Sequence, residues 1–155
     1  MKKVALIVAG GKGERMNADI PKQFLLLNNL PILMHTIKQF SHFEEIVLVL
    51  PKSQFDYWNG LCKNNNFNQI HILVEGGETR FHSVKNGLDK IDNTSVVAIH
   101  DGVRPLISTA LINNLVDEAK SGIGVIPIIP VKNSIRKIEG ENSVHIDRSN
   151  LYKVQ

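Results

Sequence analysis

Five short apolar runs recur along the chain, and they restrict its fold more than any other feature. They lie at residues 4–9, 45–50, 70–74, 95–100 and 124–131 and are rich in Val and Ile. Each run is continuous, without alternation of apolar and polar residues. Such a run is typical of a strand that is covered on both faces, as in a parallel sheet. We therefore predict five strands of a mainly parallel sheet.

The segments between these runs carry apolar residues at helical spacing. The predicted stripes are Leu33, Ile37 and Phe40; Phe55, Trp58 and Cys62; Phe81, Val84, Leu88 and Ile91; and Leu111, Leu115, Val116 and Ala119. Ser108 or Thr109 is placed to cap the last helix and Gly122 to end it. Alternating strands and helices predict an α/β fold with flanking helices. Ligands of such sheets bind beyond the carboxyl ends of the strands.

The last part of the chain is more polar. Residues 134–148 read as two short strands around a turn at 139–142. A two-stranded ribbon is marginal by itself in water, so we expect it to pack on something else, with a second copy of the chain as a candidate. The final residues, LYKVQ, contain no helix stop or turn, and the predicted sheet would end with strands on one side only. We therefore expect the chain to be incomplete at its C-terminus.

Composition excludes several classes of protein. The 155 residues suit one domain with a small appendage, and a net charge of +3 is too mild to indicate nucleic acid. Cys62 is the single cysteine, which excludes an internal disulfide and a cysteine zinc cluster. The apolar start runs into glycines instead of a cleavage site, and no run reaches the roughly 18 apolar residues of a membrane span. We expect a cytoplasmic protein with no membrane partner.

The first predicted strand runs into a glycine-rich stretch, AGGKGERM, at residues 9–16. Gly11 and Gly13 lack the third glycine of the dinucleotide fingerprint, and their spacing does not fit a P-loop. Backbone N–H groups in such a turn can bind an anion, and Arg15 and Lys22 add positive charge. The stretch favours phosphate binding. The alternative is a plain glycine turn with solvated cations.

Two further loops follow predicted strands. In GGETRFHSV (76–84) the glycines permit close approach of a ligand, and Ser83 can hydrogen-bond a base or phosphate. In HDGVRP (100–105) Asp101 can hold Mg²⁺ or a ribose hydroxyl, and Arg104 can grip a phosphate. The alternatives are an ordinary strand-to-helix turn and a local Asp–Arg surface pair, with His100 a satisfied strand-end histidine. Together the three loops indicate a nucleoside triphosphate site without a covalent nucleophile, and hence direct transfer between phosphates.

Four blocks carry a resemblance to a known family. In order and spacing, AGGKGERM…PKQF, GGETRFHSVKNGL, HDGVRP and DRSNLYKVQ resemble the 2-C-methyl-D-erythritol 4-phosphate cytidylyltransferases, from residue 4 to the end of the chain. The resemblance implies a Rossmann-like nucleotidyltransferase fold. Residues 1–130 would form the nucleotide-binding domain and residues 131–152 a protruding β-arm exchanged between the subunits of a homodimer. The family's domain continues beyond residue 155.

The resemblance also implies roles for individual residues. Arg15, Lys22, Asp101 and Arg148 would be catalytic, the first two by stabilising the charged transition state. The nucleotide would be bound by Ala9, Gly10, Gly11, Gly13, Gly77, Glu78, Ser83 and Gly102, with residues 77, 78 and 83 reading the cytosine. Asp101 would hold Mg²⁺ or ribose. Arg104, together with Ser134 and Arg148 from the second subunit, would bind the methylerythritol phosphate.

The implied reaction is CTP plus methylerythritol phosphate giving a CDP-alcohol and pyrophosphate, with Mg²⁺. Several alternatives stay open on the residues alone. The alcohol could be ribitol phosphate or another pentitol phosphate, because nothing in the loops separates these substrates. A sugar-phosphate nucleotidyltransferase could use UTP or GTP instead. The chain could also be a truncated fragment that only binds nucleotide.

Overall fold

The structure is a computed structural model that describes residues 1–10 and 20–154. It divides into two compact units, Met1–Val116 and Asp117–Gln155, and each is described by itself. The division falls after Val116, whereas the resemblance placed the end of the nucleotide-binding domain at residue 130. Among the described residues, no helix is long and apolar enough to cross a membrane.

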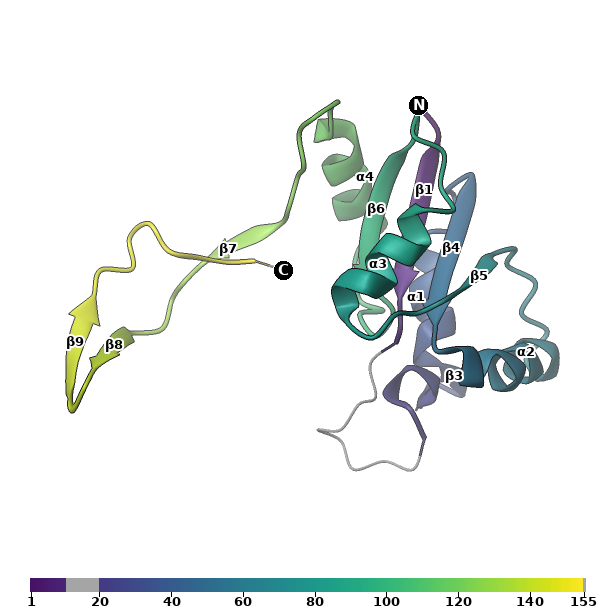
Figure 1. The fold of residues 1–155 in the computed structure, drawn as a ribbon, viewed down its shortest axis with the longest axis horizontal. Coiled ribbons are helices and arrows are strands. Elements are labelled where there is room, and N and C mark those ends of the chain that lie inside the picture. Colours follow the sequence, from purple (N-terminus) through teal and green to yellow (C-terminus); the bar gives the residue numbers. More distant parts are fainter. Residues whose placement is uncertain (11–19, 155) are drawn as a thin grey trace. The chain divides into compact units, whose positions relative to one another are not determined.

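The first unit is built on a four-stranded parallel sheet in the order β5–β4–β1–β6 (Figure 1). The strands are β1 (Lys3–Val8), β4 (Glu45–Leu50), β5 (Ile72–Glu75) and β6 (Val96–Asp101). The two central strands are buried along almost their whole length, as continuous apolar runs require. Four of the five predicted strands and the parallel sheet are thereby confirmed.

Helices cover both faces of this sheet. They are α1 (Ile32–Gln39), α2 (Phe55–Asn64), α3 (Arg80–Leu88) and α4 (Thr109–Glu118), with 3₁₀ turns η2 (Lys22–Phe24) and η3 (Lys52–Gln54) and a small ladder of β2 (Leu26–Leu27) and β3 (Leu30–Pro31). One core cluster joins Ala5 and Ile7 of β1 to residues of α1, α2 and α4, including Trp58. The other joins Val4 and Leu6 to Val84 of α3. Neighbouring residues of β1 therefore face opposite layers.

The predicted stripes of α1 and α2 are confirmed, because Leu33, Ile37, Phe40 and Trp58 are all buried. The stripe of α3 is wrong at Phe81, which is 72% exposed, and at Leu88, which is 39% exposed. A Cβ at Gly87 would lie 2.3 Å from Leu6 Cδ1 and 3.0 Å from Val49 Cγ2. The helix approaches the sheet through its small residues, so the large aromatic side chain points elsewhere.

The ends of α4 match the sequence only in part. Ser108 caps the helix, since its Oγ accepts a hydrogen bond from the Leu111 N–H at 3.2 Å. The helix ends at Glu118, before Gly122, so the predicted stop is wrong. Gly122 has φ +76° and lies in the turn that pairs Lys120 with Ile123, where its freedom at positive φ is used.

The second unit contains two antiparallel ribbons. β8 (Ile135–Glu139) pairs with β9 (Asn142–Ile146) around Gly140, which confirms the hairpin predicted at 134–148. β7 (Ile128–Pro130) pairs with β10 (Tyr152–Val154). The run at 124–131 was expected as a strand of the parallel sheet. Only its last part is a strand, and its described partner is antiparallel; prolines at 127 and 130, which lack an N–H, leave little of the run able to donate to a ladder.

Candidate functional site

The three predicted loops all follow the carboxyl ends of strands in the parallel sheet. The residues that follow β1, β5 and β6 continue the ladders: Ala9, Gly76 and Gly102 donate their N–H groups to carbonyls of adjacent strands at 2.9, 2.9 and 2.8 Å. The carboxyl ends of parallel strands lie at one end of the sheet, and such folds bind their ligands at this end. The prediction that these loops lie at the same end of the sheet is confirmed.

Ser83 lies where the loops after β1 and β5 come together. A Cβ at Gly76 would lie 3.2 Å from Ser83 Oγ, and one at Gly10 would lie 3.8 Å from it. The Ser83 side chain is buried, and its Oγ accepts from Gly77 N at 3.0 Å and donates to Gly77 O at 3.4 Å. We expected this hydroxyl to contact a base or phosphate directly. In the structure it shapes the glycine turn, and the contact with a base or phosphate stays a prediction.

The turn itself has little room for side chains. A Cβ at Gly77 would lie 2.3 Å from His82 Cβ, so only glycine fits there. Thr79 caps α3, because its Oγ1 accepts from His82 N at 3.3 Å. Gly77 and Glu78 are both exposed. The loop can therefore offer backbone groups and one carboxylate to a ligand.

Asp101 is held by two arginines. Arg104 Nε forms an ion pair with Asp101 Oδ2 at 3.0 Å, and Arg80 Nη2 donates a hydrogen bond to Asp101 Oδ1 at 3.1 Å. The local Asp–Arg pair raised as an alternative from the sequence is thus present. Arg80 was not predicted at all; its only signal was a cation at the start of the helix that follows the second glycine loop.

The turn after β6 has further fixed points. Arg104 N donates to Asp101 O at 3.1 Å, and His100 Nε2 donates to Arg104 O at 3.0 Å. Burial lowers the pKa of His100 from its usual range, while the hydrogen bond to the Arg104 carbonyl opposes that shift. This histidine is satisfied within the fold, as its position at a strand end suggested.

Gly102 and Ala9 touch each other. A Cβ at Gly102 would lie 2.6 Å from Ala9 Cβ and 3.0 Å from Leu33 Cδ1, and Thr36 Oγ1 donates to Gly102 O at 2.8 Å. Both residues were predicted to bind nucleotide. Since the Ala9 side chain is buried, it can offer only its backbone to a ligand.

Lys22 begins η2, and the residues after it are anchored in the core. Gln23 is fully buried, and its Nε2 donates to Gln54 Oε1 at 2.8 Å. Gln23 Oε1 is buried without a hydrogen-bond partner in the described part of the chain. Lys22 itself is half-buried and directly precedes these anchored residues. Gly11, Gly13 and Arg15 lie outside the described residues, and the roles expected of them stay predictions.

The second unit brings its two predicted substrate-binding residues together. Arg148 Nη1 donates to Ser134 Oγ at 3.4 Å, and both residues are exposed. The neighbouring Asp147 carboxylate accepts from Ser149 Oγ at 2.6 Å and from Ser149 N at 3.0 Å. These hydrogen bonds lower the pKa of Asp147 below its ordinary value.

Comparison with known proteins decides the family. The family model of 2-C-methyl-D-erythritol 4-phosphate cytidylyltransferase (IspD) matches residues 3–155. Relatives of that name from Azobacteroides pseudotrichonymphae and Porphyromonas gingivalis are each 48% identical, over 99% of this chain and 71% and 70% of their own lengths. The chain belongs to this family.

Solved structures agree with the cytidylyltransferase fold. The enzyme of that name from Thermus thermophilus is 26% identical and superposes with a TM-score of 0.77, over 100% of this chain and 68% of the other. A synthase from Anaerococcus prevotii, at 24% identity, has a TM-score of 0.79 over 99% of this chain and 68% of its own. The Rossmann-like nucleotidyltransferase fold inferred from the sequence is confirmed.

The prediction that Asp101 holds Mg²⁺ does not fit the arrangement seen in this family member. Each carboxylate oxygen is already paired with a guanidinium group, Oδ1 with Arg80 and Oδ2 with Arg104. Within residues 1–10 and 20–154 there is also no group of three or more His, Cys, Asp or Glu side chains that could hold a metal ion. Asp101 is arranged to hold two arginines.

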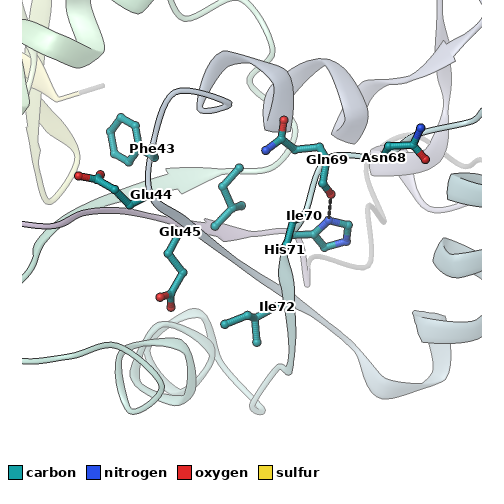
Figure 2. A pocket seen from close by; sticks show the side chains of 9 residues that line it. Phe43, Glu44, Glu45, Asn68, Gln69, Ile70, His71 and Ile72 are labelled. Atoms are coloured by element: carbon teal, nitrogen blue, oxygen red, sulfur yellow. Dashed lines mark hydrogen bonds between the residues drawn. The ribbon is translucent and has the colours of Figure 1, made fainter.

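One pocket of this cytidylyltransferase lies away from the strand-end loops. It encloses about 640 Å³ at the start of β4 and β5, and its lining includes Glu44, Gln69, Ile70 and His71 (Figure 2). Its charged and imidazole groups are already used: Glu44 Oε2 accepts from Lys3 N at 3.0 Å, and His71 Nδ1 donates to the Gln69 carbonyl at 2.7 Å. This pocket is at the amino ends of the strands, opposite the predicted site.

Proposed function

We propose that the chain transfers CMP from CTP to 2-C-methyl-D-erythritol 4-phosphate and releases pyrophosphate, a step of isoprenoid precursor biosynthesis. The observation that carries the proposal is the 48% identity to curated enzymes of that name over nearly the whole chain. The chemistry of the strand-end loops agrees with it. They combine glycine turns, a lysine and an arginine, which suits a triphosphate better than a neutral ligand.

In this proposal the backbone does much of the nucleotide binding. Ser83 occupies the N–H of Gly77 and holds the turn, so the cytosine would be read by the Gly77 carbonyl and by the exposed Glu78. Gly10 and the glycines that follow it in the sequence would admit the triphosphate closely, because a glycine adds no side chain. Lys22 and Arg15 would stabilise the charge that develops on the α-phosphate as the substrate phosphate attacks in line.

Mg²⁺ enters the proposal as an ion brought by the triphosphate of CTP. Magnesium is often bound through substrate phosphates and few protein groups, and it would neutralise part of their charge. Asp101 would then act through the two arginines that it holds.

We further propose that the enzyme is a homodimer in which the β8–β9 hairpin is the exchanged arm. Its apolar side chains support this, since Ile138 is 71% exposed and Val144 is 42% exposed within one chain. An isolated two-stranded ribbon is also marginal in water. Ser134 and Arg148 would then bind the methylerythritol phosphate across the dimer. A cytoplasmic location stays a prediction from the sequence.

The test is pyrophosphate release with Mg²⁺, CTP and either methylerythritol phosphate or ribitol phosphate, with UTP and GTP replacing CTP in parallel. We expect release with CTP and methylerythritol phosphate only. Release with ribitol phosphate instead would assign a pentitol-phosphate cytidylyltransferase, and release with UTP or GTP a different nucleotide. CTP binding without release would reduce the chain to a nucleotide-binding fragment.

A matched pair of lysine variants tests the catalytic role of Lys22. Lys22 and Lys52 each begin a 3₁₀ turn directly after a proline. Lys22→Ala should lower turnover by about two orders of magnitude or more while leaving CTP affinity nearly unchanged, as expected for charge stabilisation in the transition state. Lys52→Ala should leave both unchanged. Wild-type turnover in Lys22→Ala would remove Lys22 from this role.

A further inference from the structure

The loops after the two outer strands of the sheet are joined by one side chain. In the order β5–β4–β1–β6, the strands β5 and β6 lie at opposite edges. Arg80 starts the helix that follows β5, and its guanidinium reaches Asp101 at the end of β6 (3.1 Å). Because α3 packs on β1, β4 and β5, its first residue lies close enough to span the ends of the two central strands.

We propose that Arg80 is a positioning residue for nucleotidyl transfer. It holds Asp101, and Asp101 in turn fixes the guanidinium of Arg104 beside the strand-end loops. This inference rests on the proposed function. Arg80 has no part in the roles assigned from the sequence, and its effect on the reaction would be exerted through the other two side chains.

The geometry leaves both guanidinium groups able to bind an anion. Arg80 uses Nη2 on Oδ1, and Arg104 uses Nε on Oδ2. A guanidinium has five N–H donors in a planar fork, so each arginine keeps donors beyond its bond to Asp101. Two guanidinium groups and one carboxylate leave a net positive charge. Asp101 therefore orients the arginines without neutralising them, which suits a site that takes a triphosphate and a phosphate.

Exposure separates this role from a role in folding. The Arg80 side chain is 64% exposed and that of Asp101 is 31% exposed. Ion pairs in such surroundings contribute little to stability, roughly 0–1 kcal/mol. By contrast, a displacement of about 1 Å in a group that orients a substrate can cost on the order of 100-fold in rate. Loss of Arg80 should thus be seen in the site far more than in the fold.

Among residues 1–10 and 20–154, the other bonds that hold the turn restrained by Arg80 come from β1, α1 and the turn itself. Gly102 is fixed to β1 and to Thr36, and Arg104 O accepts from His100. None of these bonds reaches the loop after β5. Within the described residues, the bond from Arg80 to Asp101 is the one that joins the two loops. Without it, the turn at 101–104 and the glycine turn at 76–79 could move independently.

The test compares Arg80→Ala and Arg80→Lys with Lys85→Ala, an exposed cation of the same helix. For Arg80→Ala we expect kcat/KM for CTP to fall about 10- to 100-fold, with a melting temperature close to that of the wild type. Guanidinium ion at millimolar concentration should restore part of the activity, and Arg80→Lys should keep part of it. Lys85→Ala should behave as the wild type.

A double-mutant cycle gives the decisive readout. If Arg80 acts through Asp101, then Arg80→Ala should add little to the loss caused by Asp101→Asn. Additive losses, or wild-type kcat/KM in Arg80→Ala, would overturn the proposal. Hydrogen exchange of residues 100–106 in the free protein supplies a readout that needs no activity: it should become faster in Arg80→Ala and stay unchanged in Lys85→Ala. An inert wild type would count against the proposed function, whereas unchanged exchange would count against Arg80.

Discussion

At the scale of single residues, the Ser83 hydroxyl both accepts and donates a hydrogen bond to the backbone of Gly77. Gly77 N donates to Ser83 Oγ at 3.0 Å, and the hydroxyl returns to Gly77 O at 3.4 Å. From the sequence, a serine that follows two glycines in a binding loop predicts a ligand contact. Ser83 lies six residues after Gly77, and the two residues meet only because α3 folds back over the loop.

Ser83→Ala should therefore act on the shape of the loop. We expect it to cost about 1–3 kcal/mol of unfolding free energy, because a partly buried N–H loses its acceptor, and to weaken CTP binding. Ser95→Ala is the matched control, since Ser95 Oγ is buried without a partner in the described residues and its removal should be nearly neutral. Urea unfolding and CTP titration measure both effects. Equal stability of the two variants would contradict the role given to the Ser83 hydroxyl.

A second residue-scale prediction concerns His71. Trp58 Nε1 donates to His71 Nε2 at 2.8 Å, and His71 Nδ1 donates to Gln69 O at 2.7 Å. The folded state thus uses the neutral ring, with its proton on Nδ1. Burial, opposed by the bond to Gln69, lowers the pKa of His71 below its ordinary value.

The sign of the pH effect follows from this shift. Below about pH 6.5 the unfolded chain binds a proton at this histidine that the folded chain does not, so stability falls as the pH drops from 7 and stops falling below the folded pKa. Unfolding free energies measured from pH 5 to 8 should show this slope. It should be reduced in His71→Gln, which does not titrate, with the remainder due partly to His100, whose pKa is also lowered. The same slope in His71→Gln would contradict the assignment.

At the scale of elements, continuous apolar runs predicted four strands well, while helix faces were predicted less well. A buried parallel strand needs only an unbroken apolar run, and the local sequence carries that information. The face of α3 depends instead on how closely the helix approaches β1 and β4. Ser83 and Gly87 are its buried residues, whereas Phe81 and Leu88 are exposed, so hydrophobicity alone selected part of the stripe wrongly.

Gly87→Ala tests this close approach. The new methyl group would meet Leu6 Cδ1 at 2.3 Å, and Leu6 is fully buried and cannot swing into solvent. We expect a loss of about 1–3 kcal/mol of unfolding free energy from overpacking. Gly60→Ala, in α2 with nothing within 4 Å of the new Cβ, should gain up to about 1 kcal/mol from helix propensity. Thermal or urea unfolding of both variants is the measurement, and a stabilised Gly87→Ala would show that α3 can move away from the sheet.

At the scale of the whole molecule, the sequence predicted that the loops lie at the carboxyl ends of the strands. It could not predict which side chains join them. Asp101 and Arg104 are three residues apart, so their pair is readable as a local feature. Arg80 pairs with Asp101 across 21 positions of sequence, and this requires the strand order that puts β5 and β6 at opposite edges. The contact of Ser134 with Arg148 was predictable in part, because a hairpin between them brings both of its ends together.

The shared active site is the prediction that involves more than one chain. If Arg148 serves the site of the partner subunit, a chain with Lys22→Ala and a chain with Arg148→Ala should each be nearly inactive alone and recover activity when mixed. In a two-fold symmetric dimer, a mixed pair contains one site with both substitutions and one with neither. Equal mixing with random pairing makes half of the dimers mixed, so about a quarter of wild-type turnover should return.

Subunit exchange has to be shown in the same sample, for example by two affinity tags carried by the two variants. Mixing the doubly substituted chain, Lys22→Ala with Arg148→Ala, with either single variant is the control, because no pairing of those chains assembles an intact site. Recovery only in the first mixture would establish that Arg148 acts across the dimer. If doubly tagged dimers form and stay inactive, Arg148 acts within its own chain, and the hairpin that carries it would fold back instead of exchanging.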